Sequence, residues 1–178
     1  YAKIEGSINY DTLLFVPAKA PFDYYSKDYK KGVKLYCNGV KIMESCDELI
    51  PDYFGFVRGV VDSADLSLNI SREILQQDRQ VKVIAQSLEK KILAELKKML
   101  ENDRENYEKM FAEFGLSIKF GVYAGFGMNK DKLKDLLMFY SSKKEKLVTL
   151  AEYIKDMQEG QDFIYYASGE SYDKIAML

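Results

Sequence analysis

The hydrophobic pattern of the first third of the chain is typical of strands. Residues 8–16 alternate apolar with polar side chains and then run apolar from residue 13, which predicts a strand that enters a buried sheet. Residues 33–43 and 54–61 are rich in β-branched and aromatic side chains and predict further strands. Asn38 and Gly39 indicate either a two-residue hairpin turn or a bulge in one long strand.

From Ser71 onward the apolar side chains recur at helical spacing. Lysines occupy the other faces of this repeat, which predicts a long amphipathic helix packed by one stripe on a sheet. The stripe consists of Ile84, Leu88, Ile92, Leu96 and Leu100. A second helix is expected to follow a cap at Asn102 and Asp103 and to weaken at Gly115.

Glycines between residues 121 and 127 mark the expected boundary between two subdomains. Beyond them we predict a helix that is capped by Asn129 and reaches Phe139, and then a short extended piece. A helix over residues 151–157, a strand over residues 163–166 and a final helix after Ser171 complete the chain.

This order of elements predicts an α/β protein built from two α-β-α sandwich subdomains joined by a helical linker. The large subdomain is expected to span residues 1–120 and to contain the long helix. The small subdomain is expected to span residues 121–178 and to be truncated at its C-terminal end.

Composition narrows the classes of function. The 26 basic and 28 acidic residues leave a net charge of −2, which provides no basic footprint for nucleic acid and no polybasic membrane signal. The chain has no His, so catalytic triads that use His and the usual His-containing zinc sites are excluded. Cys37 and Cys46 lack CxxC spacing and are interpreted as free thiols of a reducing cytoplasm.

Arginine is scarce, and its distribution is informative. Three of the four arginines fall between residues 58 and 79, and Arg72 lies in the expected first turn of the long helix with Gln76 one turn later on the same face. A helix N-terminus favours anions, so a guanidinium there opposes the dipole unless a phosphate comes to it. The alternative is that Arg72 pairs with Glu73 or Asp78 on the surface.

Several segments resemble the middle segment of the ninety-kilodalton heat-shock chaperones in their order and spacing. They are residues 13–17, 20–23, 33–36, 49–51, 57–63, 68–73, 164–166 and 169–171. Residues 57–77 carry the most specific part of the resemblance. Residues 120–123 and 136–142 are more similar to the bacterial branch of this family, the high-temperature protein G type, than to the eukaryotic branch.

The resemblance implies a mechanism that this segment alone does not complete. In such chaperones an N-terminal domain holds ATP with magnesium, and the middle segment supplies an arginine to the γ-phosphate. On the family pattern that arginine is Arg72, Gln76 is its polar neighbour near the phosphate, and Asn69 shapes the catalytic loop. Phe22 matches the aromatic that packs on this loop and helps to release it into the active position. The segment is therefore expected to bind no cofactor or metal and to be no enzyme in isolation.

The resemblance also implies partners. These are the N-terminal ATPase domain and the C-terminal dimerisation domain of the same chain, in a cytoplasmic homodimer, together with unfolded or partly folded client proteins. No nucleic acid or membrane partner is expected. Two alternatives remain open, a non-catalytic interaction scaffold in which Arg72 is a surface residue, and the transducer domain of a related DNA-acting ATPase. Arg72 and the acidic balance speak against the second, because those relatives place a lysine at the phosphate and need a basic surface.

Overall fold

The computed structural model describes residues 1–66 and 79–177, and the chain divides into two compact units, Tyr1–Met138 and Phe139–Leu178. The division therefore lies later than the predicted boundary at residue 121. Residue 121 falls inside helix α3 (Arg104–Tyr123), and residues 121–138 pack with the first unit. Leu133 and Leu136 are fully buried there, and the Tyr107 hydroxyl donates a hydrogen bond of 2.6 Å to the Leu136 carbonyl.

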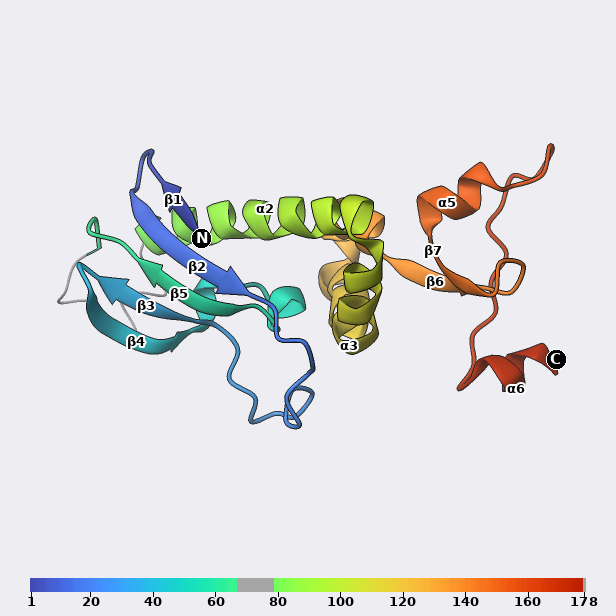
Figure 1. Ribbon diagram of the computed structural model, residues 1–178, viewed down its shortest axis with the longest axis horizontal. Helices are drawn as coiled ribbons and strands as arrows, with labels where there is room; N and C mark the ends of the chain where they lie inside the picture. Colours follow the sequence, from blue (N-terminus) through green and yellow to red (C-terminus); the bar gives the residue numbers. More distant parts are fainter. Residues whose placement is uncertain (67–78, 178) are drawn as a thin grey trace. The chain divides into compact units, whose positions relative to one another are not determined.

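The first unit contains a five-stranded sheet with the order β1-β2-β5-β3-β4 (Figure 1). The strands are β1 (Ala2–Ile4), β2 (Tyr10–Phe15), β3 (Val33–Cys37), β4 (Val40–Cys46) and β5 (Arg58–Asp62). Only the β3–β5 pair is parallel among these strands. The α/β class predicted from the hydrophobic pattern is confirmed.

The turn at Asn38 and Gly39 is a hairpin that joins β3 to β4. Both residues have positive φ, 51° and 75°, as a two-residue turn of the type favoured between twisted strands requires. The pairing of β3 with β4 also shifts register near Leu35, so the hairpin carries an irregularity as well. The short 3₁₀ helices η1 (Asp47–Leu49) and η2 (Asp52–Phe54) follow, which makes β5 shorter than predicted.

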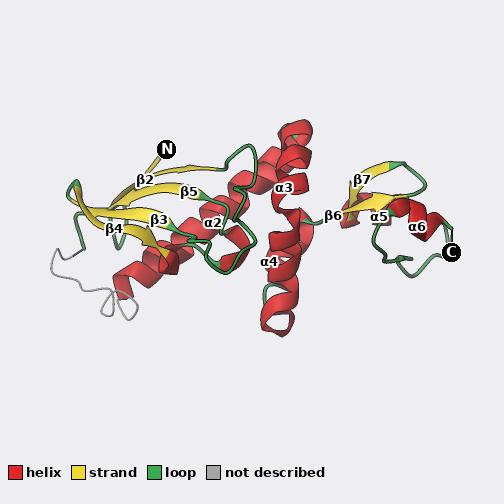
Figure 2. Cartoon of the chain, turned by 90° about the horizontal axis from the view of Figure 1, so that it is seen from below, coloured by secondary structure: helices red, strands yellow, loops and turns green. Residues whose placement is uncertain are grey.

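Helix α2 (Arg79–Asn102) runs along one face of the sheet (Figures 1 and 2). It buries the predicted stripe from Ile84 to Leu96, with Val81 added at its start. The Tyr10 hydroxyl donates a hydrogen bond of 2.7 Å to Ser87 Oγ, which joins β2 to this helix. The start predicted at Ser71 lies outside the described residues.

Helix α3 continues past Gly115, where the sequence predicted its end. The glycine serves packing instead, since a Cβ atom there would lie 2.7 Å from the Phe111 ring. The helix contributes Phe114 to the core, where its ring stacks on Phe56 at 4.8 Å between centroids. The aromatic residues of α3 thus close the end of the unit next to η2.

The predicted helix from Asn129 to Phe139 is wrong in its extent. A short turn, η3 (Ala124–Gly127), precedes α4 (Lys130–Leu133) and η4 (Lys134–Leu136). Asn129 donates its side-chain amide to the Gly121 carbonyl at 3.3 Å and makes no capping bond. Phe139 belongs to strand β6 (Met138–Ser141).

The second unit is small. β6 pairs with β7 (Lys146–Thr149), and the helices α5 (Leu150–Lys155) and α6 (Tyr172–Ala176) follow. The predicted strand over residues 163–166 is wrong, because these residues have no regular structure. The backbone N–H of Tyr165 donates to the Tyr153 hydroxyl at 3.2 Å instead of entering a ladder. The described part of this unit offers that segment no neighbouring strand.

Candidate functional site

The predicted catalytic residues fall in the segment between β5 and α2. Asn69, Arg72 and Gln76 lie within residues 67–78, outside the described residues. Phe22 is described. The structure therefore describes the residues on either side of this segment and the loop that carries Phe22.

The chain entering the segment is fixed to the sheet by hydrogen bonds. Ser63 donates two of these bonds: its N–H donates to the Tyr36 carbonyl at 3.2 Å, and its hydroxyl donates to the Asn9 carbonyl at 2.7 Å. Asp65 accepts a bond of 2.6 Å from the Asn9 N–H. Leu66 is buried, so the last described residue before the segment is anchored in the core.

The chain leaving the segment is fixed by apolar burial. Val81 and Ile84 in the first turns of α2 have exposed fractions of 1% and 0%. Arg79, the first described residue of this helix, is exposed. Burying a large aliphatic side chain contributes about 1.5–3 kcal/mol, so Val81 and Ile84 are held in the core by strong packing.

Phe22 lies in the loop between β2 and β3, and its side chain is fully exposed. The loop is nevertheless tied to α3. The Ala20 N–H donates to Glu113 Oε2 at 2.9 Å, and the Tyr24 and Ser117 hydroxyls are 2.9 Å apart. Burial raises the pKa of Tyr24 to about 12. The Phe22 side chain is thus exposed to solvent on a loop that is fixed to α3 by hydrogen bonds on both sides of it.

Arg58 has a structural role that the arginine count alone did not predict. Its guanidinium donates a hydrogen bond of 2.8 Å to the Lys30 carbonyl and lies over the Tyr29 ring, 4.8 Å from the ring centroid. The side chain therefore ties β5 to the loop after Phe22. Arg104 is also engaged, since it pairs with Glu108 at 2.7 Å.

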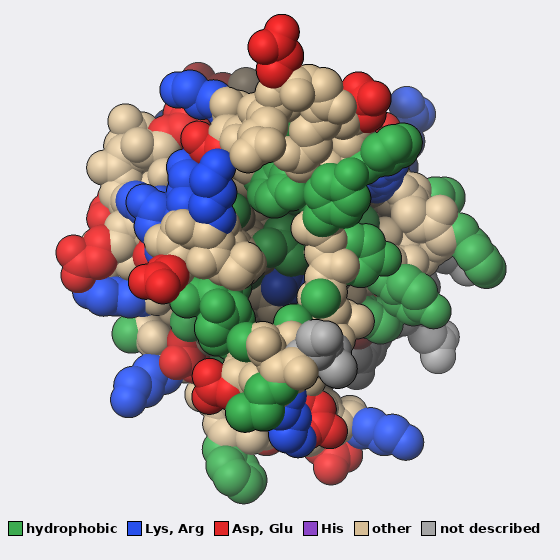
Figure 3. All heavy atoms as spheres, turned by 90° about the vertical axis from the view of Figure 1, so that its right-hand side faces the viewer, with side chains coloured by type: hydrophobic (Ala, Val, Ile, Leu, Met, Phe, Trp, Pro, Cys, Tyr) green, Lys and Arg blue, Asp and Glu red, His purple; other side chains and the backbone are tan. Residues whose placement is uncertain are grey.

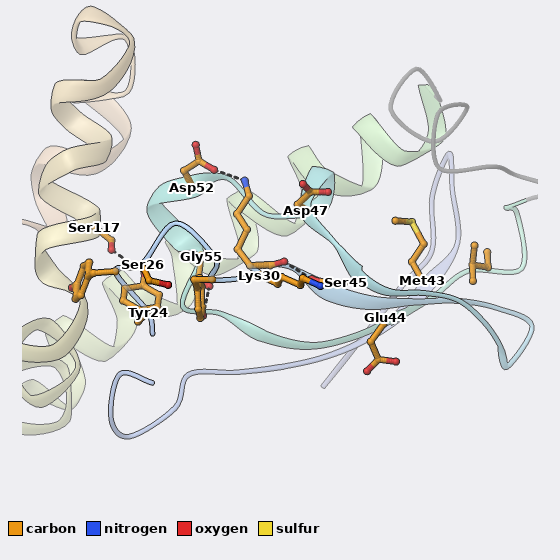
Figure 4. Close-up of a pocket in the computed structure, with 14 residues that line it drawn as sticks. Tyr24, Ser26, Lys30, Met43, Glu44, Ser45, Asp47, Asp52, Gly55 and Ser117 are labelled. Carbon is orange, nitrogen blue, oxygen red and sulfur yellow. Dashed lines mark hydrogen bonds and ion pairs between the residues drawn. The ribbon is translucent and has the colours of Figure 1, made fainter. Parts of the chain in front are cut away.

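An open groove of about 790 Å³ lies beside β4 (Figure 4). The loop after Phe22 forms one wall with three tyrosines, β4 forms another, and η2 and α3 complete the lining. The lining residues are Tyr24, Tyr25, Ser26, Tyr29, Lys30, Lys31, Ile42, Met43, Glu44, Ser45, Asp47, Asp52, Gly55 and Ser117.

Charged side chains near the groove pair with one another. Glu44 on β4 pairs with Lys34 at 2.9 Å and with Lys41 at 2.6 Å. Hydrogen bonds from Lys41 and then Lys34 lower the pKa of Glu44 to about 2. Lys31 pairs with Asp52. The groove therefore presents little net charge to a ligand.

A second surface that the sequence analysis missed lies on α3. Leu116, Phe120 and Tyr123 share one face of the helix and have exposed fractions of 64%, 59% and 80%. Phe126 follows in η3, where it is fully exposed and has a φ of 55°. The helical spacing of these apolar residues is visible in the sequence. The buried residues of α3 recur at helical spacing too, so only the fold decides which face is exposed.

Exposed hydrophobic side chains are not confined to α3. On the face that Figure 3 presents they lie among charged and polar groups. In the second unit Phe163, Tyr165 and Tyr166 are exposed by 71%, 73% and 89%.

Within residues 1–66 and 79–177, no cluster of three or more His, Cys, Asp or Glu side chains has an arrangement suited to a metal ion. In the same part of the chain, no helix combines the length and apolarity needed to cross a membrane. Cys37 and Cys46 are free and buried, in agreement with the expected free thiols.

Comparison with known proteins identifies relatives along the whole chain. The family model described as "Hsp90 protein" matches residues 1–177. "Chaperone protein HtpG" of Clostridium perfringens is 59% identical over all 178 residues, and that of Bacillus subtilis is 58% identical. The chain spans only 29% and 28% of the length of these two relatives.

A solved structure agrees with the sequence relatives. The middle domain of a Plasmodium falciparum heat shock protein superposes with a TM-score of 0.80 at 28% sequence identity. The match covers 96% of this chain and 66% of that one.

Proposed function

The chain belongs to the Hsp90 family and corresponds to its middle domain, and from that premise we propose that Arg72 completes an ATPase site whose nucleotide is held by another domain. The observation that carries the proposal is the family match across residues 1–177, which includes the segment from Leu68 to Glu73. The role of each residue in that segment is part of the proposal.

The chemistry favours an arginine for this task. Negative charge on the terminal phosphate must be held while the bond to the leaving group breaks, and a planar, permanently charged fork holds it in a fixed geometry. Arg58 and Arg104 are engaged in internal contacts, as described above. Arg72 remains the arginine that the family pattern assigns to the nucleotide.

The frame of the segment supports the proposal. A side chain that contacts a nucleotide on another domain must be held in a defined orientation. Fixed positions on either side of its segment help to provide that orientation. Leu66 and Val81 supply such points on either side of residues 67–78. In this proposal Gln76 is the polar neighbour at the phosphate, Asn69 shapes the loop, and Phe22 supports the loop in its active position.

The test uses the full-length chaperone. Replacing Arg72 with Ala should lower ATP turnover by roughly 10³-fold, the scale seen for such arginines in other nucleotide hydrolases. ATP binding, measured by calorimetry, should change little, since the pocket belongs to the N-terminal domain. Phe22→Ala should lower turnover by a smaller factor, because Phe22 acts through the loop.

Arg79→Ala is the matched control, since Arg79 is an exposed arginine at the start of α2. It should leave turnover within about twofold, because the proposal assigns Arg79 no contact with the nucleotide and its side chain is exposed. If Arg72→Ala keeps normal turnover, the ATPase role is wrong and the interaction-scaffold alternative is favoured. The alternative of a DNA-acting ATPase has lost its support, because the family match is to Hsp90.

We further propose the context that the family suggests. The parent protein would be a cytoplasmic homodimer with an N-terminal domain that binds ATP and magnesium and a C-terminal dimerisation domain. Unfolded or partly folded proteins would be its clients. The exposed apolar residues of α3, together with Phe22, support client contact, because large exposed apolar side chains mark surfaces for protein interaction.

A further inference from the structure

The chain leaves β5 and its sheet over residues 63–66, here called the stem. β5 lies between β2 and β3 in the sheet (Figure 1). Its backbone pairing with β2 ends at Asp11 and Asp62, and its pairing with β3 ends at Tyr36 and Asp62. One further backbone bond follows, from the Ser63 N–H to the Tyr36 carbonyl at 3.2 Å. Beyond that point, side chains hold the stem.

On the β2 side, two side chains of the stem bind both backbone groups of Asn9, the residue directly before β2. The Ser63 hydroxyl donates to the Asn9 carbonyl at 2.7 Å, and Asp65 Oδ2 accepts from the Asn9 N–H at 2.6 Å. A paired strand offers a donor and an acceptor to one residue of its neighbour in the same way. The two side chains therefore continue the pairing with the β2 side after the backbone pairing of β5 has ended.

On the β3 side, a buried thiol binds the end of the stem. Cys37 Sγ donates to the Leu66 carbonyl at 3.0 Å, and Cys37 and Leu66 are exposed by only 1% and 4%. A thiol is a weak donor, but a buried carbonyl that has no partner is costly, so the bond matters to this backbone group. Leu66 is the last described residue before Arg72. Cys37 therefore fixes the backbone at the last described point before the proposed catalytic arginine.

Bonds from two neighbours fix both the position and the direction of the stem. Asn9 holds it from the β2 side, and Cys37 holds it from the β3 side. Hydrogen bonds are directional, so bonds from two sides restrict rotation of the backbone that a single bond would allow. The Ser63 side chain is exposed by only 1%, so water does not compete for the bond that its hydroxyl makes. The chain therefore leaves the stem in a defined direction.

We propose that Ser63, Asp65 and Cys37 are positioning residues for ATP hydrolysis. By fixing the stem, they set the direction from which Arg72 reaches the nucleotide, and none of the three touches the nucleotide itself. A displacement of about 1 Å can slow a reaction by about 10²-fold, so a loss of orientation at a distance from the phosphate is sufficient to lower turnover. This inference rests on the function proposed for Arg72 and adds three side chains to it.

The first test compares two buried hydroxyls of the same sheet in the full-length chaperone. Ser63→Ala removes the bond to Asn9, and Thr12→Val removes a bond of 2.9 Å from Thr12 Oγ1 to the Val60 carbonyl. Thr12 is the matched control, because its side chain is also buried and donates to a carbonyl, but it lies within the paired part of β2.

The two variants should lose similar stability, measured by urea unfolding, and differ in turnover. Ser63→Ala should lower kcat by about two- to tenfold, the effect of one hydrogen bond, whereas Thr12→Val should leave kcat within about twofold. Neither should change KM for ATP, because the proposal places the nucleotide pocket in another domain. A purely structural role of Ser63 predicts equal kcat values for the two variants.

The second test asks whether Ser63 acts through Arg72. Ser63→Ala is introduced into the Arg72→Ala chaperone, and the slow turnover is followed by release of radiolabelled phosphate. If the stem only orients Arg72, Ser63→Ala should change kcat by less than about twofold once the arginine is absent. A general weakening of the fold would lower kcat by the same factor in both backgrounds.

The third test uses conservative variants of the other two residues. Cys37→Ala removes the donor to Leu66 and should lower kcat by about two- to tenfold, and Cys37→Ser, which keeps a donor, should be at least about twofold faster than Cys37→Ala. Asp65→Ala should also lower kcat, and Asp65→Asn should restore it because the amide keeps an acceptor oxygen. The Asp65 side chain is exposed, so its variants test the stem even where Ser63→Ala does not fold. Circular dichroism verifies the fold of each variant.

The outcomes separate the positioning role from the ATPase role. If Arg72→Ala lowers turnover while Ser63→Ala and Thr12→Val have equal kcat values, the positioning role is wrong and the ATPase role stands. Equal losses from Ser63→Ala with and without Arg72, or equal kcat values of Cys37→Ser and Cys37→Ala, also overturn the positioning role. If Arg72→Ala keeps normal turnover, the proposed function fails and the positioning role fails with it.

Discussion

The two units of the chain differ in how much of their apolar sequence they bury. In Tyr1–Met138, side chains such as Phe54, Leu88 and Phe114 have no exposed surface. In the described residues of Phe139–Leu178, only Val148 and Thr149 are buried, although the unit is rich in aromatic residues. Apolar composition alone therefore does not produce a core. A sheet of several strands covered by helices does, whereas a two-stranded ribbon gives apolar side chains too few partners.

The two units are also stabilised by different kinds of interaction. The first unit is held by burial, and its loops are tied to helices by hydrogen bonds such as that of Ala20 with Glu113. The second unit depends on local devices. The Thr149 hydroxyl accepts a bond from the Glu152 N–H at 3.2 Å, and the Glu152 carboxylate accepts one from the Thr149 N–H at 2.7 Å, which caps α5.

The largest expected contrast comes from truncating one phenylalanine in each unit. Phe114→Ala should lower the free energy of unfolding by about 3–5 kcal/mol, because it removes a fully buried ring stacked on Phe56. Phe163→Ala, at a side chain exposed by 71%, should change it by less than about 0.5 kcal/mol. Urea unfolding followed by circular dichroism measures both, and equal losses would show that the second unit has a core of its own.

A smaller contrast is expected from the helix caps. Thr149→Ala should destabilise α5 by about 0.5–2 kcal/mol, because it removes one half of a reciprocal cap. Ser171→Ala, at the start of the exposed helix α6, should have a weaker effect, since its cap is one-sided. Amide exchange within residues 150–155 and 172–176 measures each helix separately. A larger loss of protection in α6 than in α5 would contradict the assignment.

The smallest change in stability at neutral pH is expected from a substitution at Tyr24. Its phenol is neutral at pH 7, and burial raises its pKa to about 12 from the usual 10. A fold that raises this pKa favours the neutral form. Its contribution to stability is therefore complete below pH 10 and is lost as the pH rises through 12.

Tyr24→Phe tests this pH dependence. The variant loses the contact with Ser117, which costs about 0.5–1.5 kcal/mol at pH 8. Because a phenylalanine has nothing to ionise, the gap in stability between wild type and variant should narrow between pH 10 and pH 12. Urea unfolding at pH 8, 10 and 11.5 measures the gap, and a constant gap would show that Tyr24 ionises as an exposed tyrosine does.

The local patterns of the sequence predicted most elements correctly. Alternation located β2, a composition rich in β-branched and aromatic residues located β3, the i+4 stripe located α2, and Asn38 with Gly39 located the tight turn. The errors occur where long-range packing overrides a local signal. Gly115 indicated a helix end but fits against the Phe111 ring, and Asn129 indicated a cap but bonds to Gly121.

The candidate sites show the same division. Arg72, Gln76 and Asn69 come from the sequence motif, and they remain predictions because they lie outside the described residues. The frame formed by Leu66 and Val81, the clamp formed by Arg58 and the groove beside β4 come from the structure. Each of these joins residues that are far apart in the chain, which a local pattern does not reveal.

By itself, the sequence determined the α/β class, the long amphipathic helix, the tight turn after β3 and the family to which the chain belongs. The tertiary structure decided that the division falls after Met138, that residues 163–166 form no strand, and that β4 pairs with β3 alone among the described residues. The physical reason is that propensity and periodicity act over a few residues. Edges, boundaries and exposed faces depend instead on which distant segments come together, and the free energy of burial decides that.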